Sequence, residues 1–304
     1  MSPHGSVQAR ARAARAARTS VFSNVALTVI KLGAGLITGS VSVLSEALHS
    51  GLDLAAAVMA FMAVRKAREP ADGEHNFGHG KYESMSGLAE GALILVAVGL
   101  IVWGAIGRLL AGHAEVRQPL LGVAVMAISA VVNVFVSRML FRVAKDTQSL
   151  ALEADAWHLS TDVWTSVGVF AGMAVISVGV RLGFAEVHNV DPIVAIAIAI
   201  VITRAALGIT RRSYDHLVDR SLPQAEVEKI ESLLMQHYPE FSGFHRLRTR
   251  QAGPERYIDL HLEVPGEKSV AESHALCDHL EDDLQALIRG AQVLIHVEPR
   301  RGDV

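Results

Sequence analysis

Two apolar segments of membrane length each carry a histidine and an aspartate four residues apart. Residues 40–64 read SVSVLSEALHSGLDLAAAVMAFMAV, and residues 150–180 read LALEADAWHLSTDVWTSVGVFAGMAVISVGV. The ionisable pairs are His49 with Asp53 and His158 with Asp162. A spacing of four places both side chains of a pair on one helix face. Because ionisable groups are costly in hydrocarbon and normally face a bundle interior, the segments predict a helical membrane protein with a polar interior.

Six segments are apolar enough to cross a membrane, since a span needs roughly 20 mostly apolar residues. They lie at about 20–38, 41–65, 84–110, 119–144, 150–180 and 191–212. Only Gly39 and Ser40 separate the first two segments, which predicts a tight helical hairpin. Positive residues gather near the N-terminus and in alternate connections, which predicts that both chain ends are cytoplasmic. Lys31 and Arg204 fall inside spans and are expected to snorkel toward the nearer interface.

After Arg212 the pattern becomes that of a soluble domain. Helical apolar spacing is followed by two alternating segments that flank a Gly253–Pro254 turn, then by a second amphipathic helix and a third strand. This order predicts a small α+β domain. The sequence therefore divides into a basic cytoplasmic N-terminal tail (1–19), a six-helix transmembrane domain (20–212) and a C-terminal cytoplasmic domain (213–304).

Composition narrows the class of ligand. Hydrophobic residues make up 51% of the chain and its mean hydropathy is +0.33, so the first two-thirds of the chain is too apolar for an ordinary soluble fold. From Asp215 to the end there are 17 acidic and 10 basic residues, whereas the remainder carries a net charge of +4. An acidic terminal domain argues against nucleic acid and fits a cationic ligand. The single cysteine, Cys277, excludes an internal disulfide and a thiolate cluster, and the absence of an HExxH motif argues against a metalloenzyme.

The two ionisable pairs are expected to lie at matching depths, because the second and fifth spans run in opposite directions. At 1.5 Å per residue, His158 lies ~12 Å and Asp162 ~18 Å above the inner edge of the hydrocarbon. Asp53 then comes level with His158, and His49 with Asp162. Two imidazoles and two carboxylates suit a borderline divalent metal such as zinc, whereas two unrelated helix-packing hydrogen bonds are the alternative. Because metal binding requires neutral imidazole, it releases protons and makes metal–proton exchange feasible.

Further candidate ligands lie outside this quartet. Three more carboxylates either attract cations at the mouths of a path or are interfacial groups satisfied by water: Glu46, Glu90 and Asp155. The loop between the second and third spans holds a possible ligand set at spacings of three and four, with chance exposure as the alternative: Asp72, His75 and His79.

The terminal domain holds seven of the 14 histidines. His245 and His261 fall on different expected strands, and His274 falls on the second helix. His296 and Glu298 share one face of the last strand because they are two residues apart. These residues predict a metal cluster, with surface histidines that have no ligand role as the alternative.

Several motifs resemble the cation diffusion facilitator family, in its bacterial zinc and ferrous-iron efflux branch. They are TGSVSVLSEALHSGLD, HNFGHGKYES, ALEADAWHLSTDV and HRLRTRQAGPERYIDLHLEV, and the resemblance covers the chain after its N-tail. It implies a homodimer with six spans per protomer, a metallochaperone-like cytoplasmic domain for regulation and dimerisation, and a transport site at the quartet. It also implies a second site in the loop, a binuclear site at the five terminal-domain residues, and an interlocking salt bridge between Lys81 and Asp219.

The sequence departs from this branch at two ligands. The branch often has Asp where this chain has His49, and usually has Asp where this chain has Glu298. Two histidines and two aspartates favour Zn²⁺ over Mn²⁺ or Fe²⁺. We therefore expect a Zn²⁺/H⁺ antiporter that exports metal across a bacterial inner membrane, with a membrane-anchored metal sensor as the alternative. Beyond this expectation the sequence gives no reliable order of preference among Zn²⁺, Cd²⁺, Fe²⁺ and Co²⁺, and it leaves the proton stoichiometry and the occupancy of the loop site open.

Overall fold

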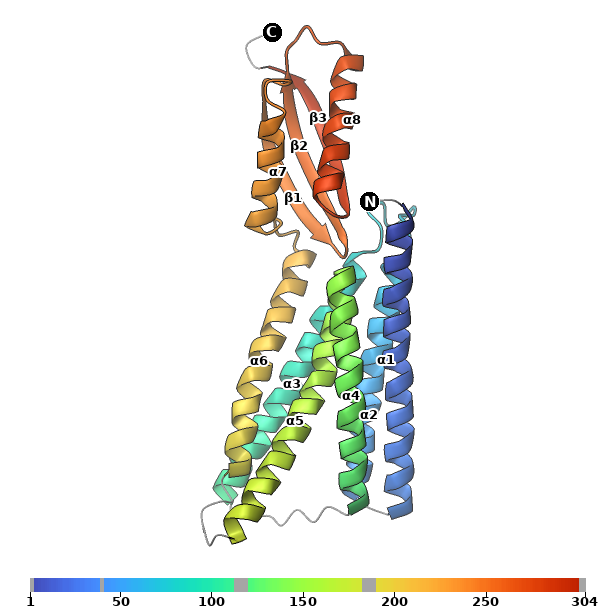
Figure 1. Ribbon diagram of the computed structural model, residues 1–304, viewed down its shortest axis with the longest axis vertical. Helices are drawn as coiled ribbons and strands as arrows, with labels where there is room; N and C mark the ends of the chain where they lie inside the picture. The colour runs from blue at the N-terminus through green and yellow to red at the C-terminus, as the bar shows by residue number, and fades with distance from the viewer. Residues whose placement is uncertain (1–2, 39–40, 112–119, 182–189, 301–304) are drawn as a thin grey trace. The chain divides into compact units, whose positions relative to one another are not determined.

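The structure, a computed structural model, describes residues 3–38, 41–111, 120–181 and 190–300 (Figure 1). The expected hairpin turn at Gly39 and Ser40 lies outside these ranges. The first six helices are α1 (Pro3–Thr38), α2 (Val41–Lys66), α3 (Lys81–Ala111), α4 (Leu120–Thr147), α5 (Leu150–Arg181) and α6 (Val190–Leu217). The remaining elements are α7 (Gln224–Gln236), β1 (Gly243–Ala252), β2 (Glu255–Val264), α8 (Val270–Leu287) and β3 (Ala291–Pro299). They form two compact units, one of residues 9–214 and one mainly of residues from 215 onward.

Within the described residues, five helices are long and apolar enough to cross a membrane. The spans are Ala11–Ile37, Glu46–Lys66, Lys81–Gly107, Ala124–Thr147 and Ile193–Leu217. The one remaining helix of the described part of this unit is α5. It carries Glu153, Asp155 and Asp162 and packs against α2, α3 and α4. A helix with three carboxylates is therefore in contact with three others, as expected for a helix that presents ionisable groups to a bundle interior.

Helix α1 begins well before the first apolar segment. Residues assigned to a separate tail form its first turns, where Ala13, Ala16 and Ala17 are buried against a cluster that includes Val64 and Leu140. Small side chains allow this close packing between helices. The described part of the basic tail is thus helical, and from Ala9 onward it is part of the packed bundle.

Small residues also bring α3 against α6. A Cβ atom at Gly91 would lie 2.3 Å from Thr210 Oγ1, and one at Gly87 would lie 2.6 Å from Ser213 Oγ. Such separations are too short for nonbonded atoms, so glycine at both positions permits this approach. Further along the pair, Ile94 packs in an apolar cluster with residues of α6.

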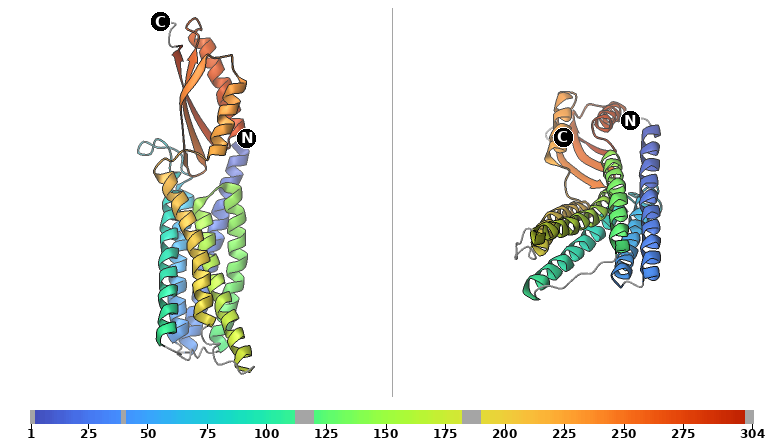
Figure 2. Two further views of the ribbon diagram at one scale, coloured as in Figure 1. Left: turned by 90° about the vertical axis from the view of Figure 1, so that its left-hand side faces the viewer. Right: turned by 60° about the horizontal axis from the view of Figure 1, so that its bottom comes forward.

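The second unit has the predicted order of helix, strand, strand, helix, strand. In its sheet, β1 pairs antiparallel with the central β2, and β2 pairs parallel with β3. Side chains along β2 alternate between buried and partly exposed, so the sheet has one core face and one open face. Helices α7 and α8 cover the core face (Figure 2), where the largest buried side chains are Ile230, Leu234, Phe241, Ile258, Leu260, Leu262 and Leu280.

Candidate metal centre

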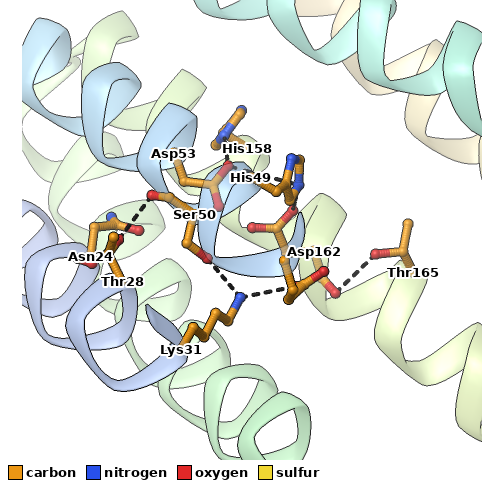
Figure 3. Close-up of polar contacts among 10 residues, drawn as sticks. Asn24, Thr28, Lys31, His49, Ser50, Asp53, His158, Asp162 and Thr165 are labelled. Atoms are coloured by element: carbon orange, nitrogen blue, oxygen red, sulfur yellow. Dashed lines mark hydrogen bonds and ion pairs between the residues drawn. The ribbon is translucent and has the colours of Figure 1, made fainter. Parts of the chain in front are cut away.

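The four ionisable side chains of the quartet meet between α2 and α5 (Figure 3). His158 Nε2 lies 3.0 Å from Asp53 Oδ1, and His49 Nε2 lies 3.6 Å from Asp162 Oδ1. Within α2, His49 Nε2 lies 3.9 Å from Asp53 Oδ1. Each histidine therefore faces the aspartate of the other helix, which is the pairing that the antiparallel geometry predicts.

These separations suit a tetrahedral metal ion. Zinc bonds of about 2.0–2.1 Å place tetrahedral ligand atoms about 3.3 Å apart, and the three measured distances bracket that value. The Asp53 side chain is only 5% exposed, and a buried carboxylate is costly unless a cation or hydrogen-bond donors accompany it. His49, Asp53 and Asp162 offer ligand atoms that all lie within 4.8 Å of one another, whereas His158 is outside that group and contacts Asp53. Metal binding by the four residues together remains a prediction.

Lys31 does not snorkel, so that expectation is wrong. Its Nζ donates to Glu46 Oε1 at 2.9 Å and to Ser50 Oγ at 2.7 Å, and its side chain is only 7% exposed. These partners on α2 attract the ammonium into the bundle beside the quartet (Figure 3). Arg204 is exposed on α6, and its snorkelling stays a prediction.

The three further carboxylates have different environments. Glu46 is paired with Lys31. Glu90 on α3 and Asp155 on α5 are buried within the bundle, and Ser86 Oγ donates to Glu90 Oε1 at 3.0 Å. Because the protein covers both side chains, water at an interface does not account for Glu90 or Asp155. Their role in attracting cations remains a prediction.

The loop before α3 brings its three candidate ligands together. Asp72 Oδ1 lies 3.4 Å from His75 Nδ1, and Asp72 Oδ2 lies 3.4 Å from His79 Nε2. The His75 amide donates to Asp72 Oδ1 at 2.7 Å, and the Glu74 amide adds a second bond at 3.0 Å. These backbone donors lower the pKa of Asp72, the His75 amide most of all. The carboxylate is therefore held ionised, the form that binds metal.

The open face of the terminal sheet carries another cluster of candidate metal ligands. His245 Nε2 lies 3.0 Å from Glu298 Oε1, and His261 Nδ1 lies 3.4 Å from Glu298 Oε2. The rings of His261 and His296 are 4.7 Å apart. Strand register explains the grouping, because His261 on β2 is the partner of His245 on β1 and of His296 on β3. We call His245, His261, His296 and Glu298 the sheet-face cluster.

Two predicted contacts concern residues outside these clusters, His274 and Asp219. His274 lies on α8, which covers the other face of the sheet, and its Nδ1 is 3.3 Å from Asp278 Oδ1 on the same helix. Within the described residues of this chain, His274 is therefore not grouped with the sheet-face cluster. Asp219 Oδ1 lies 3.4 Å from Arg250 Nη1, and a bridge from Asp219 to Lys81 of the helical unit stays a prediction.

A further group of ligand atoms was not predicted from the sequence. His237, at the end of α7, meets His279 and Asp283 of α8. The i, i+4 spacing of His279 and Asp283 is visible in the sequence, but His237 is 42 residues away from His279 and is brought to it only by the packing of the two helices.

Comparison with known proteins identifies the family. Residues 17–218 match the cation efflux transmembrane domain, and residues 222–300 match the cation efflux protein cytoplasmic domain. The uncharacterized transporter sll1263 of Synechocystis sp. is 40% identical over 280 residues, which are 92% of this chain and 88% of that protein. The cation-efflux pump FieF of Salmonella arizonae is 33% identical over 285 residues, 94% of this chain and 92% of that protein.

Among solved structures, the zinc form of CzrB is 41% identical and covers 28% of this chain and 96% of that chain, with a TM-score of 0.27. The two family matches together span nearly the whole chain beyond the first turns of α1 and agree with its division into a helical unit and an α+β unit. The chain therefore belongs to the cation diffusion facilitator family of divalent metal efflux transporters, integral membrane proteins with a helical transmembrane domain and a cytoplasmic α+β domain.

Proposed function

We propose that the protein exports Zn²⁺ from the cytoplasm in exchange for protons, with the quartet between α2 and α5 as its transport site. The observation that carries this proposal is the cross-pairing of His158 with Asp53 and of His49 with Asp162. Four ionisable groups from two apolar helices serve no evident purpose in a structural bundle, because burying them in hydrocarbon is costly.

The donor set argues for zinc among the divalent metals. Imidazole nitrogen suits Zn²⁺, whereas Mg²⁺, Ca²⁺ and Mn²⁺ prefer all-oxygen sites. Cd²⁺, Co²⁺ and Fe²⁺ remain competing substrates.

Proton exchange follows from the same contacts. Each histidine faces a carboxylate oxygen across the helices, so a ring nitrogen that carries a proton can donate it to that oxygen. A metal ion binds the same nitrogen and requires it to be deprotonated, so metal binding at the site releases protons. Protons arriving from the other side of the membrane then favour metal release.

We infer that cytoplasmic metal regulates a homodimer through the sheet-face cluster. This cluster lies on the open face of the sheet, where a second copy has access, whereas His274 lies on α8 over the other face. Participation of His274 therefore requires a second copy to supply it. Metal held jointly by two terminal domains shifts the equilibrium of the spans only if it binds their conformations with different affinity. We place the dimer in a bacterial inner membrane with both termini in the cytoplasm.

The test is ⁶⁵Zn²⁺ flux into proteoliposomes under an imposed pH gradient. Asp162→Ala removes one quartet ligand, and the matched control Asp146→Ala removes a carboxylate of α4 that pairs with Arg12. We expect gradient-dependent flux in wild type and the control, and none in Asp162→Ala. Flux of Cd²⁺ or Fe²⁺ without Zn²⁺ flux would contradict the selectivity argument. Binding of zinc with no flux of any metal would favour a membrane-anchored sensor.

A further inference from the structure

The helical layer of the cytoplasmic domain carries a compact set of metal-ligating atoms. One atom each from His237, His279 and Asp283 lies within 4.8 Å of the other two. His237 Nε2 is 2.9 Å from Asp283 Oδ2, and His279 Nε2 is 3.8 Å from the same oxygen. The two rings meet edge to face, with centroids 5.1 Å apart.

These distances match a zinc-like ion with little rearrangement. Tetrahedral coordination with bonds of about 2.0–2.1 Å separates ligand atoms by about 3.3 Å, midway between the two nitrogen–oxygen distances to Asp283. Two histidines and one aspartate also form a donor set that borderline divalent metals prefer.

A second carboxylate orients the most buried ligand. Glu240 Oε1 lies 3.1 Å from His237 Nδ1, the ring nitrogen that does not face Asp283. Metal-binding histidines commonly donate their other N–H to a carboxylate, which fixes the ring and increases its basicity as a ligand. Glu240 therefore stands where such a partner is expected.

The surroundings favour a cation and allow it to enter. Residues 270–287 of α8 contain five acidic residues and no lysine or arginine. The His279 side chain is 59% exposed, so an ion can reach the group from solvent and keep water as a fourth ligand.

We propose that His237, His279 and Asp283 bind a divalent metal of the zinc class, in a helix-face site separate from the sheet-face cluster. The ligands join the end of α7 to α8 on the layer that covers the core face of the sheet. All three belong to one chain, so the site needs no second copy. Its occupancy links cytoplasmic metal to the order of α7, the first element after the transmembrane helix α6.

Histidine labelling with diethyl pyrocarbonate tests this site in the full-length protein in detergent, with modification read residue by residue by mass spectrometry. His279 is the reporter because it is exposed. With zinc at ten times its dissociation constant only about one site in ten is free, so labelling of His279 should slow about tenfold. Asp283→Asn should abolish this protection. The matched control Asp278→Asn removes the equivalent carboxylate beside His274 and should retain it.

His261→Ala separates the two cytoplasmic sites. Zinc should still protect His279 in this variant, because the helix-face ligands are intact. Equal labelling of His279 with and without zinc, in a wild-type sample whose His261 is protected, would show that the group is only a hydrogen-bonded contact. Loss of His279 protection in His261→Ala would also overturn the proposal. Should Asp283→Asn fail to fold, His279→Gln must lower the zinc bound per chain by one relative to Asp278→Asn.

Discussion

Replacing Lys31 with methionine tests whether this buried ammonium holds α1 against α2 beside the quartet. Nζ contacts Glu46 Oε1 at 2.9 Å and Ser50 Oγ at 2.7 Å. Methionine retains most of the apolar stem but removes both contacts and leaves Glu46 without its cation. Ser50→Ala is the matched control, because it removes one hydrogen bond and keeps the ion pair.

The expected changes in the free energy of unfolding decide which measurement is informative. Removing one member of a buried ion pair costs about 3–5 kcal/mol, and the 34% exposure of the Glu46 side chain lowers that cost by solvent screening. Replacing a lysine in hydrocarbon by an apolar residue removes a cost of about 2.5–3.5 kcal/mol and so stabilises the helix bundle. The two effects nearly cancel in Lys31→Met alone, so the informative quantity is the coupling energy of the pair. We expect about 1–2 kcal/mol, above the roughly 0.6 kcal/mol average of interhelical hydrogen bonds in membranes.

A double-mutant cycle measures this coupling. The variants are Lys31→Met, Glu46→Gln and their combination, unfolded with sodium dodecyl sulfate in mixed micelles. Ser50→Ala should leave the Lys31–Glu46 coupling largely intact. A snorkelling lysine makes no contact with Glu46, so a coupling energy indistinguishable from zero would refute the ion pair.

Two further predictions concern the cytoplasmic domain. Glu226 accepts hydrogen bonds from Arg256 Nε at 2.7 Å and Nη2 at 3.3 Å. Glu226→Ala leaves this buried guanidinium without its carboxylate and should destabilise the domain by about 2–4 kcal/mol, seen as faster hydrogen exchange in β2. Glu226→Ala combined with Arg256→Met should recover most of the loss. Ser269 caps α8 in a capping box with Glu272, so Ser269→Ala should cost about 1 kcal/mol in the first turn of the helix. Hydrogen bonding from Ser269 lowers the pKa of Glu272 below its ordinary 4.5, so the part of the stabilisation that comes from the ionised Glu272 carboxylate is present above that pH and is lost as the pH falls through the lowered value. An exchange difference between wild type and Ser269→Ala that persists unchanged in acid would contradict the assignment.

Much of the quartet geometry was predictable because helix rise is constant. Spacing along α2 and α5, together with opposite directions, is sufficient to pair His49 with Asp162 and His158 with Asp53. The order of elements in the cytoplasmic domain was predictable for a similar reason: alternation and helical spacing are local patterns, and Gly253–Pro254 marks the turn between β1 and β2.

Contacts between distant elements were not predictable in this way. Snorkelling is a property of a lone helix in lipid, and Lys31 is instead held by Glu46, 15 residues away on the neighbouring helix. His237 lies near His279 only because α7 and α8 pack side by side over the sheet. Counting histidines in the terminal domain indicates metal binding but does not say on which face of the sheet each one lies.

The two faces of that sheet give the cytoplasmic clusters different dependence on a second chain. The sheet-face cluster lies on the face of the sheet opposite α7 and α8, so we expect a partner to reach it and complete its ligands. The helix-face group is built from residues of one chain on the opposite layer. We therefore expect metal binding at the first to be linked to dimer formation, and metal binding at the second to be linked to the order of α7 and α8 within each protomer. A domain with both proposed sites would respond to the cytoplasmic metal concentration with two separate structural changes.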